Sequence, residues 1–316
     1  MSLSLLANTL LPLILLIGLG ATLSRIRFLG PQFTADLNKL AFWIALPALL
    51  FRSAAGATEA TAGTWWLLGV MLTGTLVIAA VGWWVSRLLG VPVAGQGTFV
   101  QSAFRGNLAF IGIPVLAASV AGETETVRVP LMASGVIVMT LTMAFFNILA
   151  VIVLQASRQG ERAGGVRTML APIATNPLMI SGLSGLLLSL TGLRMPMFLD
   201  RTLEVLAGSA VPIALLCIGG SLSATHMTGR RSWIVSAALL KVAASPLVAA
   251  GLLWVTGLGP MEWRIALVFA STSTAAAAYV MARQMGGDET LASGSIALST
   301  ILSAISLSVA LLVTGL

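Results

Sequence analysis

The chain has 316 residues, of which 58% are hydrophobic and only 9% are charged, and its 17 basic and 10 acidic residues give a net charge of +7. A soluble domain carries roughly 25% charged residues. The composition therefore argues against a soluble enzyme, a nucleic-acid-binding protein and a disordered chain. It indicates an integral membrane protein, in which ten spanning helices of about 20 residues would use most of the chain.

Apolar runs separated by charges, Gly and Pro predict ten spanning helices, because backbone groups in lipid must pair within their own segment. In the first half these are Leu5–Leu23, Leu37–Ala54, Thr64–Ser86, Gly97–Ala121 and Val129–Gln155. In the second half they are Pro172–Leu190, Phe198–Leu222, Trp233–Thr256, Trp263–Met285 and Leu291–Thr314. We expect residues 1–155 to form one five-helix unit, residues 156–171 a polar cytoplasmic linker and residues 172–316 a second unit.

Basic residues predict the orientation of the helices, because they gather in cytoplasmic loops. One side of the membrane is expected to hold Arg25, Arg27, Lys39, Arg87, Arg158, Arg162, Arg167, Arg230, Arg231 and Arg283. The other side is expected to hold Arg52, Arg128, Arg194, Arg201 and Arg264. This distribution places the first side in the cytoplasm and both termini outside, in a multi-pass protein of the cell's inner (plasma) membrane.

The two halves show a weak internal repeat at a shift of 165 residues. At this shift the matching pairs are Pro12 with Pro177, Pro47 with Pro212, Gly20 with Gly185 and Phe104 with Phe269. An odd number of helices in each half makes the halves enter the membrane in opposite directions. Inverted repeats of this kind are typical of secondary transporters, whose sites form near the midplane at broken helices.

The predicted fourth span contains the clearest candidate for such a break. Arg105, Gly106, Asn107, Gly112 and Pro114 occur within ten residues of an otherwise apolar segment. Proline removes a backbone donor and crowds the preceding turn, and Asn107 can supply a donor and an acceptor where backbone groups are freed. The segment after the break would direct its amide end at an anion. The alternative is an ordinary packing kink.

The equivalent part of the predicted ninth span has four consecutive hydroxyl residues, Ser271, Thr272, Ser273 and Thr274, and no proline. They are candidates for binding a substrate or Na⁺, and the alternative is that they bond to their own or a neighbouring helix. Two cations, Arg105 and Lys241, fall within predicted spans, where charge is costly and usually functional. Each is a candidate for holding a carboxylate, with side-chain extension to the interface as the alternative.

The remaining features set limits on the chemistry. Pro47 and Pro212 are expected to kink the second and seventh spans. The single cysteine, Cys217, and the single histidine, His226, argue against a disulfide, a metal site or a bound cofactor. Spanning acidic residues and a Ser/His pair are lacking, which argues against an intramembrane enzyme. The same lack of buried acids leaves Na⁺ coupling, potential-driven uniport, or H⁺ movement on the substrate.

The run Arg105–Pro114, an RGNxxFIGIP pattern, resembles bacterial members of the auxin efflux carrier family, of the malate permease or organic anion transporter type. The stretches NPLMISGLSGLLL (176–188), VPIALLCIGGSL (211–222) and LKVAASPL (240–247) are similar as well. The resemblance implies an all-α fold of ten helices in two inverted five-helix repeats, with the fourth and ninth helices broken and crossed. It also implies scaffold and transport parts that move as an elevator, and a homodimer formed through the scaffold.

The resemblance assigns Asn107, Gly112 and Pro114 to the first half of the crossing and Ser271–Thr274 to the second, where relatives usually carry a proline. The function expected is secondary transport of a small organic anion, without enzymatic activity or a nucleic-acid partner. The alternatives are transport of another small solute, such as an amino acid or neutral metabolite with Na⁺ coupling, or a channel.

Overall fold

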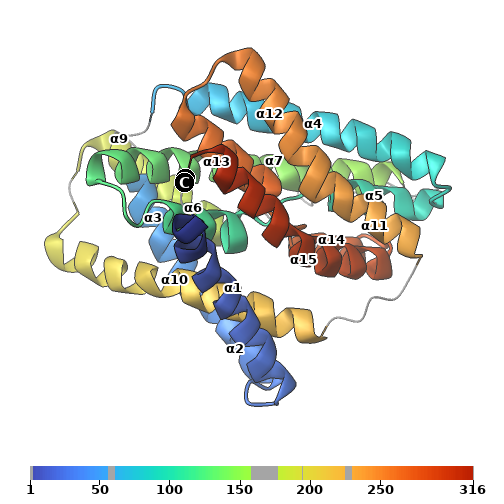
Figure 1. Ribbon diagram of the computed structural model, residues 1–316, viewed down its shortest axis with the longest axis horizontal. Helices are drawn as coiled ribbons and strands as arrows, with labels where there is room; N and C mark the ends of the chain where they lie inside the picture. Colours follow the sequence, from blue (N-terminus) through green and yellow to red (C-terminus); the bar gives the residue numbers. More distant parts are fainter. Residues whose placement is uncertain (1–2, 56–60, 158–176, 194, 225–229, 316) are drawn as a thin grey trace.

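The computed structural model describes residues 3–55, 61–157, 177–193, 195–224 and 230–315, and all regular secondary structure in these ranges is helical (Figure 1). This confirms the all-α prediction. The predicted linker lies almost entirely outside the described residues, as does His226. The first-half helices are α1 (Leu3–Arg25), α2 (Pro31–Leu40), η1 (Ala41–Ala45), α3 (Leu46–Ala55), α4 (Thr64–Leu88), α5 (Val93–Phe104), η3 (Leu108–Gly112), α6 (Ile113–Ser119) and α7 (Glu125–Ala156). The second-half helices are α9 (Pro177–Thr191), α10 (Met197–Ala224), α11 (Arg231–Leu239), η4 (Leu240–Ala244), α12 (Ser245–Thr256), α13 (Pro260–Ser271), α14 (Ala277–Gln284) and α15 (Glu289–Val313).

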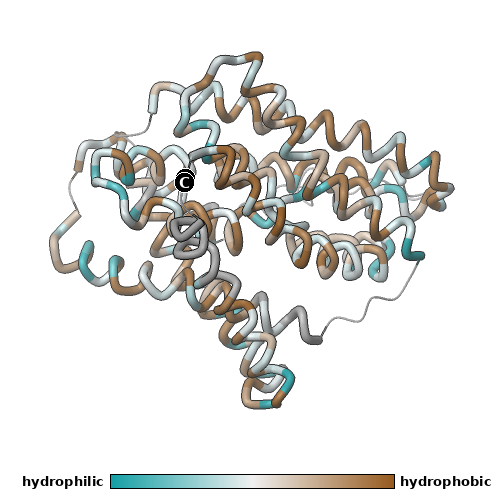
Figure 2. Tube along the Cα trace, viewed as in Figure 1, coloured by the Kyte–Doolittle hydropathy of each residue, from teal (hydrophilic) through white to brown (hydrophobic). Residues whose placement is uncertain are grey.

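Length and apolar character make this a multi-pass membrane protein. Five of the described helical stretches are long and apolar enough to cross a bilayer: Gln32–Arg52, Thr64–Leu88, Glu125–Ala156, Arg231–Thr256 and Glu289–Val313. Figure 2 shows hydrophobic residues along most of the helical length, with many of the hydrophilic residues near helix ends and connections. Large apolar side chains face outward, among them Trp254, which is 81% exposed. Such a surface is suited to lipid rather than water.

Helices from both halves of the chain pack into two groups. In the first, α1 packs along α10, and α3 packs against both α9 and α10 (Figure 1). We call this the α1/α10 group; it also contains α2 and η1. The second, the α5/α13 group, comprises α4, α5, η3, α6, α7, α11, η4, α12, α13, α14 and α15. The groups meet where α7 contacts α3 and α9, where η3 contacts α10, and where α1 contacts α15. α6 also contacts α1 and α10.

Glycines allow the helices of the α1/α10 group to approach closely. A methyl group added at Gly20 of α1 would fall against the carbonyl oxygen of Leu216 in α10, and one added at Gly219 of α10 would fall against the carbonyl of Ile17. Where α9 crosses α3, Gly185 lies in the same way against the carbonyl of Phe51. Small residues permit this kind of backbone contact between membrane helices.

An ion-pair cluster also joins α3 to α10. The Arg52 guanidinium donates to both carboxylate oxygens of Asp200, from Nε at 2.6 Å and from Nη2 at 3.1 Å. Its Nη1 lies 3.4 Å from Glu204. The three side chains are partly exposed, so this cluster fixes the geometry of the helix ends more than it stabilises the fold.

Three prolines each follow a wide π-helical turn by two residues. Pro47 follows η1, Pro114 follows η3 and Pro246 follows η4. A proline ring crowds the carbonyl four residues earlier, and a π-turn moves that carbonyl out of the way. Pro212, in contrast, lies inside α10, which continues past it as an α-helix. Of the two predicted kink sites, Pro47 therefore coincides with a change of helix type and Pro212 does not.

Candidate functional site

Two interrupted helices cross near the middle of the α5/α13 group. α5 ends at Phe104, the chain is extended at Arg105, and helix resumes at Leu108. α13 ends at Ser271, Thr272 is extended, and α14 starts at Ala277. The residues predicted the first break and the family resemblance implied both, and the structure shows both helices interrupted, the second without a proline.

Main-chain hydrogen bonds join the two breaks to each other. The Asn107 amide donates to the Ser273 carbonyl at 2.8 Å, and the Ala275 amide donates to the Arg105 carbonyl at 2.9 Å. Gly106 and Thr274 thereby form an isolated antiparallel bridge. A side chain at Gly106 would meet Thr272 Oγ1 at 2.8 Å, so the crossing needs glycine here. These four freed backbone groups are thus satisfied within the protein, as the bilayer requires.

The position of the first break corrects one expectation. The sequence assigned Gly112 and Pro114 to the break, but both belong to the helical segment that follows it. Gly112 ends η3, and a methyl group there would meet the Phe269 ring at 3.0 Å. Pro114 lies within the continuous helical stretch Leu108–Ser119, where the π-turn η3 accommodates its ring. The chain is extended instead at Arg105, next to Gly106.

The four hydroxyl residues explain how α13 ends without proline. Thr272 Oγ1 donates to the Phe269 carbonyl at 2.7 Å, and Thr274 Oγ1 donates to the Ser102 carbonyl at 2.7 Å. All four residues, Ser271–Thr274, are completely buried. The alternative considered for these hydroxyls, that they bond to their own or a neighbouring helix, holds for Thr272 and Thr274. Ser271 Oγ has no hydrogen-bond partner among the described residues, and Ser273 Oγ makes a 3.4 Å contact with the Thr274 carbonyl.

Asn107 is the most accessible polar side chain of the crossing. It is half-buried, unlike its neighbours Arg105 and Gly106. Its Oδ1 accepts a hydrogen bond from the Phe110 amide at 3.4 Å, which caps the resumed helix. The helix that resumes after the second break begins with exposed residues, Ala276 and Ala277. Two positive helix ends therefore start within a few residues of the crossing.

Arg105 is buried rather than extended to a surface. Its side chain lies between α7 and α14, where the guanidinium donates to Asn147 Oδ1, to the Phe146 carbonyl at 3.5 Å and to Met281 Sδ at 3.0 Å. Only 6% of its surface is exposed. None of the ion pairs among the described residues involves it, so a full positive charge stands beside the crossing.

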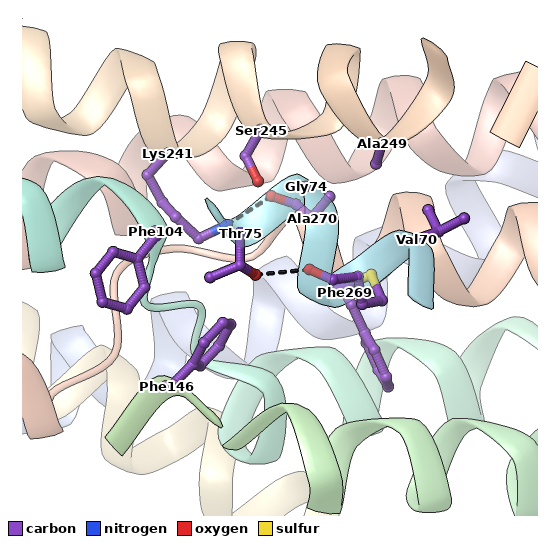
Figure 3. A pocket seen from close by; sticks show the side chains of 11 residues that line it. Val70, Gly74, Thr75, Phe104, Phe146, Lys241, Ser245, Ala249, Phe269 and Ala270 are labelled. Carbon is purple, nitrogen blue, oxygen red and sulfur yellow. Dashed lines mark hydrogen bonds between the residues drawn. The ribbon is translucent and has the colours of Figure 1, made fainter. Parts of the chain in front are cut away.

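Lys241 also places its side chain beside the crossing, near the end of α13. It lies in η4, is 1% exposed, and its Nζ donates to the Ala270 carbonyl at 2.6 Å. Figure 3 shows its side chain in a small pocket with Thr75, Ser245 and Phe104. The free volume of this pocket is about 20 Å³, which is room for about one water molecule.

Several residues of the site were not found from the sequence. Asn147 holds Arg105, and Gln101 Nε2 donates to the Ala278 carbonyl at 2.9 Å. Both are isolated amide side chains in apolar segments, and this contrast is the signal that could have identified them. Ser299 accepts the Thr274 amide at 3.0 Å, which no local pattern reveals. In the described part of the chain no group of His, Cys, Asp and Glu side chains is arranged to hold a metal ion.

Comparison with known proteins assigns the chain to a family. Residues 5–164 and 165–311 match the family described as Membrane transport protein, and the chain belongs to this family, which is of the auxin efflux carrier type. A relative named "Uncharacterized transporter", from Methanothermobacter thermautotrophicus, is 30% identical over 306 residues, which cover 95% of each chain. A second, named "Putative malonate transporter", from Rhizobium meliloti, is 27% identical over 299 residues, covering 93% of this chain and 91% of the relative. The resemblance seen in the sequence is confirmed.

Proposed function

We propose that this protein is a secondary transporter that carries a small carboxylate anion across the plasma membrane, with the anion bound at the helix crossing. The observation that carries the proposal is the charge of the crossing. Arg105 and Lys241 are both buried there, and no described carboxylate pairs with either. In the described part of the chain, only neutral acceptors hold the two cations, namely carbonyl and amide oxygens and a thioether sulfur, which carry partial charges. Buried charges are normally compensated, and an anionic substrate supplies the remaining compensation.

The recognition groups follow from the same geometry. Asn107 offers an accessible amide next to the start of η3, and the exposed start of α14 adds a second set of backbone donors. A dicarboxylate fits two cations better than a monocarboxylate does. The relative whose name refers to malonate supports this class of substrate. Residues Ser271 and Ser273 remain candidate ligands on the second half of the crossing.

We further propose that the two halves are inverted repeats and that the two helix groups move against each other. The contact of Gly20 with Leu216 and that of Gly185 with Phe51 are related by the same shift of 165 residues. The α1/α10 group would act as the scaffold and homodimer interface, and the α5/α13 group as the moving part. Phe42 of η1 stacks on Phe110 of η3 across their boundary, with ring centroids 6.3 Å apart, and a substrate-sized opening would form there. The basic residues favour a cytoplasmic linker with both termini outside.

Uptake into proteoliposomes tests the proposal. Purified protein should give saturable uptake of radiolabelled malonate, and unlabelled succinate and malate should compete better than acetate. Alanine and glucose, added at the same concentrations, serve as neutral competitors. Absence of saturable uptake or exchange of any carboxylate would sink the proposal, and uptake of alanine instead would favour the other class of solute. Currents far above carrier turnover would identify a channel.

A further inference from the structure

The ammonium group of Lys241, a residue of η4, binds the C-terminal end of α13. Ala270 is the next-to-last residue of α13. The amide four residues later, that of Thr274, donates to Ser299 Oγ instead of to the Ala270 carbonyl. Lys241 Nζ donates to the Ala270 carbonyl instead, at 2.6 Å. The last carbonyls of a helix carry partial negative charge, so the ammonium and the helix end stabilise each other.

This is the kind of place where transporters bind a coupling ion. In secondary transporters with discontinuous helices, half-helix C-terminal ends and unwound carbonyls coordinate Na⁺ or H⁺. Here the Lys241 side chain already fills the space beside the crossing, since a methyl group at Gly106 would meet its Cε at 3.3 Å. The pocket that remains has a volume of about 20 Å³.

The walls of this pocket provide oxygen ligands for a small cation. Thr75 and Ser245 line it together with Ala270, and Figure 3 shows both hydroxyl side chains near Lys241. Thr75 Oγ1 donates to the Met71 carbonyl at 2.7 Å, which leaves its lone pairs available. If the lysine side chain were removed, the Ala270 carbonyl and two hydroxyl side chains would line the space that it leaves.

We propose that Lys241 takes the place of a coupling Na⁺ at the end of α13, so that anion transport by this protein is independent of Na⁺. The Lys241 ammonium supplies the positive charge that other carriers obtain from a bound Na⁺. The transport part of this proposal rests on the proposed function, whereas the cation-binding part can be measured without any substrate.

Thermal unfolding of the full-length protein in detergent tests the cation-binding part. Unfolding temperatures are compared in NaCl and in choline chloride at equal ionic strength. The wild type should show no difference between the two salts. Lys241→Ala should unfold at a lower temperature in choline and recover several degrees, saturably, with Na⁺, because a ligand of the folded state stabilises it. Lys39→Ala is the matched control, since Lys39 is the other lysine of the chain and is exposed.

Stabilisation of the wild type by Na⁺ but not by choline would overturn the proposal, and so would a folded Lys241→Ala variant that does not respond to Na⁺. If Lys241→Ala does not fold, Lys241→Ser replaces it, and the wild-type comparison still decides. Malonate uptake at clamped voltage gives the second readout. It should be independent of Na⁺ in the wild type and dependent on Na⁺ in Lys241→Ala. If neither protein takes up malonate or any other carboxylate, the proposed function fails, while the unfolding data still judge the role of Lys241.

Discussion

Replacement of Asn107 by aspartate is expected to abolish malonate uptake while leaving the protein folded. Aspartate caps a helix as well as asparagine does, so the bond from the Phe110 amide is kept. The new carboxylate would stand about 5 Å from a bound anion, where two like charges repel by roughly 3 kcal/mol at an effective dielectric constant of about 20. This corresponds to a loss of about 100-fold in affinity. Initial uptake rates in proteoliposomes measure it.

Asn38→Asp is the control for the added charge. Asn38 is an exposed residue of α2, far in the chain from the crossing, and its replacement should leave uptake unchanged. Asn107→Ala, which loses both the cap and the amide, should also be inactive and somewhat less stable. Wild-type uptake by a folded Asn107→Asp variant would show that the anion binds elsewhere.

Replacement of Gly219 by alanine is expected to disrupt the packing of α1 on α10. The added methyl group would collide with the carbonyl oxygen of Ile17, so the helices must separate. Overpacking of this kind costs about 1–3 kcal/mol, which corresponds to a drop of roughly 3–8 °C in unfolding temperature. Fluorescence-detected size-exclusion after heating measures the change.

Gly208→Ala provides a matched comparison on the same helix. Nothing lies within 4 Å of the methyl group that it would add, and alanine is favoured over glycine in a helix by up to about 1 kcal/mol. Its unfolding temperature should be equal to or above that of the wild type. Equal unfolding temperatures for the two variants would contradict the close approach of α1 and α10.

The sequence predicts the helical segments well because their signal is local. Hydrophobic length alone places the described helices within predicted spans apart from a few residues at the ends, except α2, most of which precedes the predicted span Leu37–Ala54. The lone cations in apolar runs identify Arg105 and Lys241. The position of the first break was predicted less well, because a proline that a π-turn accommodates inside a helix, such as Pro114, resembles in sequence a proline that interrupts one. Only the folded chain shows the difference.

The partners of the site residues could not be predicted. Lys241 bonds to a main-chain carbonyl 29 residues away, and Arg105 to Asn147. Every residue has a main-chain carbonyl, so the sequence does not show which carbonyl accepts the hydrogen bond from Lys241. The grouping of helices from both halves likewise depends on close contacts such as that of Gly219 with α1, which arise only from tertiary packing.

The junction of the two interrupted helices has a consequence for how this protein can change over evolution. It is formed by amides and carbonyls of Arg105, Asn107, Ser273 and Ala275, together with the absence of a side chain at Gly106. Most substitutions nearby leave main-chain bonds intact. The crossing can therefore persist while the side chains around it are exchanged, and under the proposed function new substrates could be accepted without redesign of the helices that carry them.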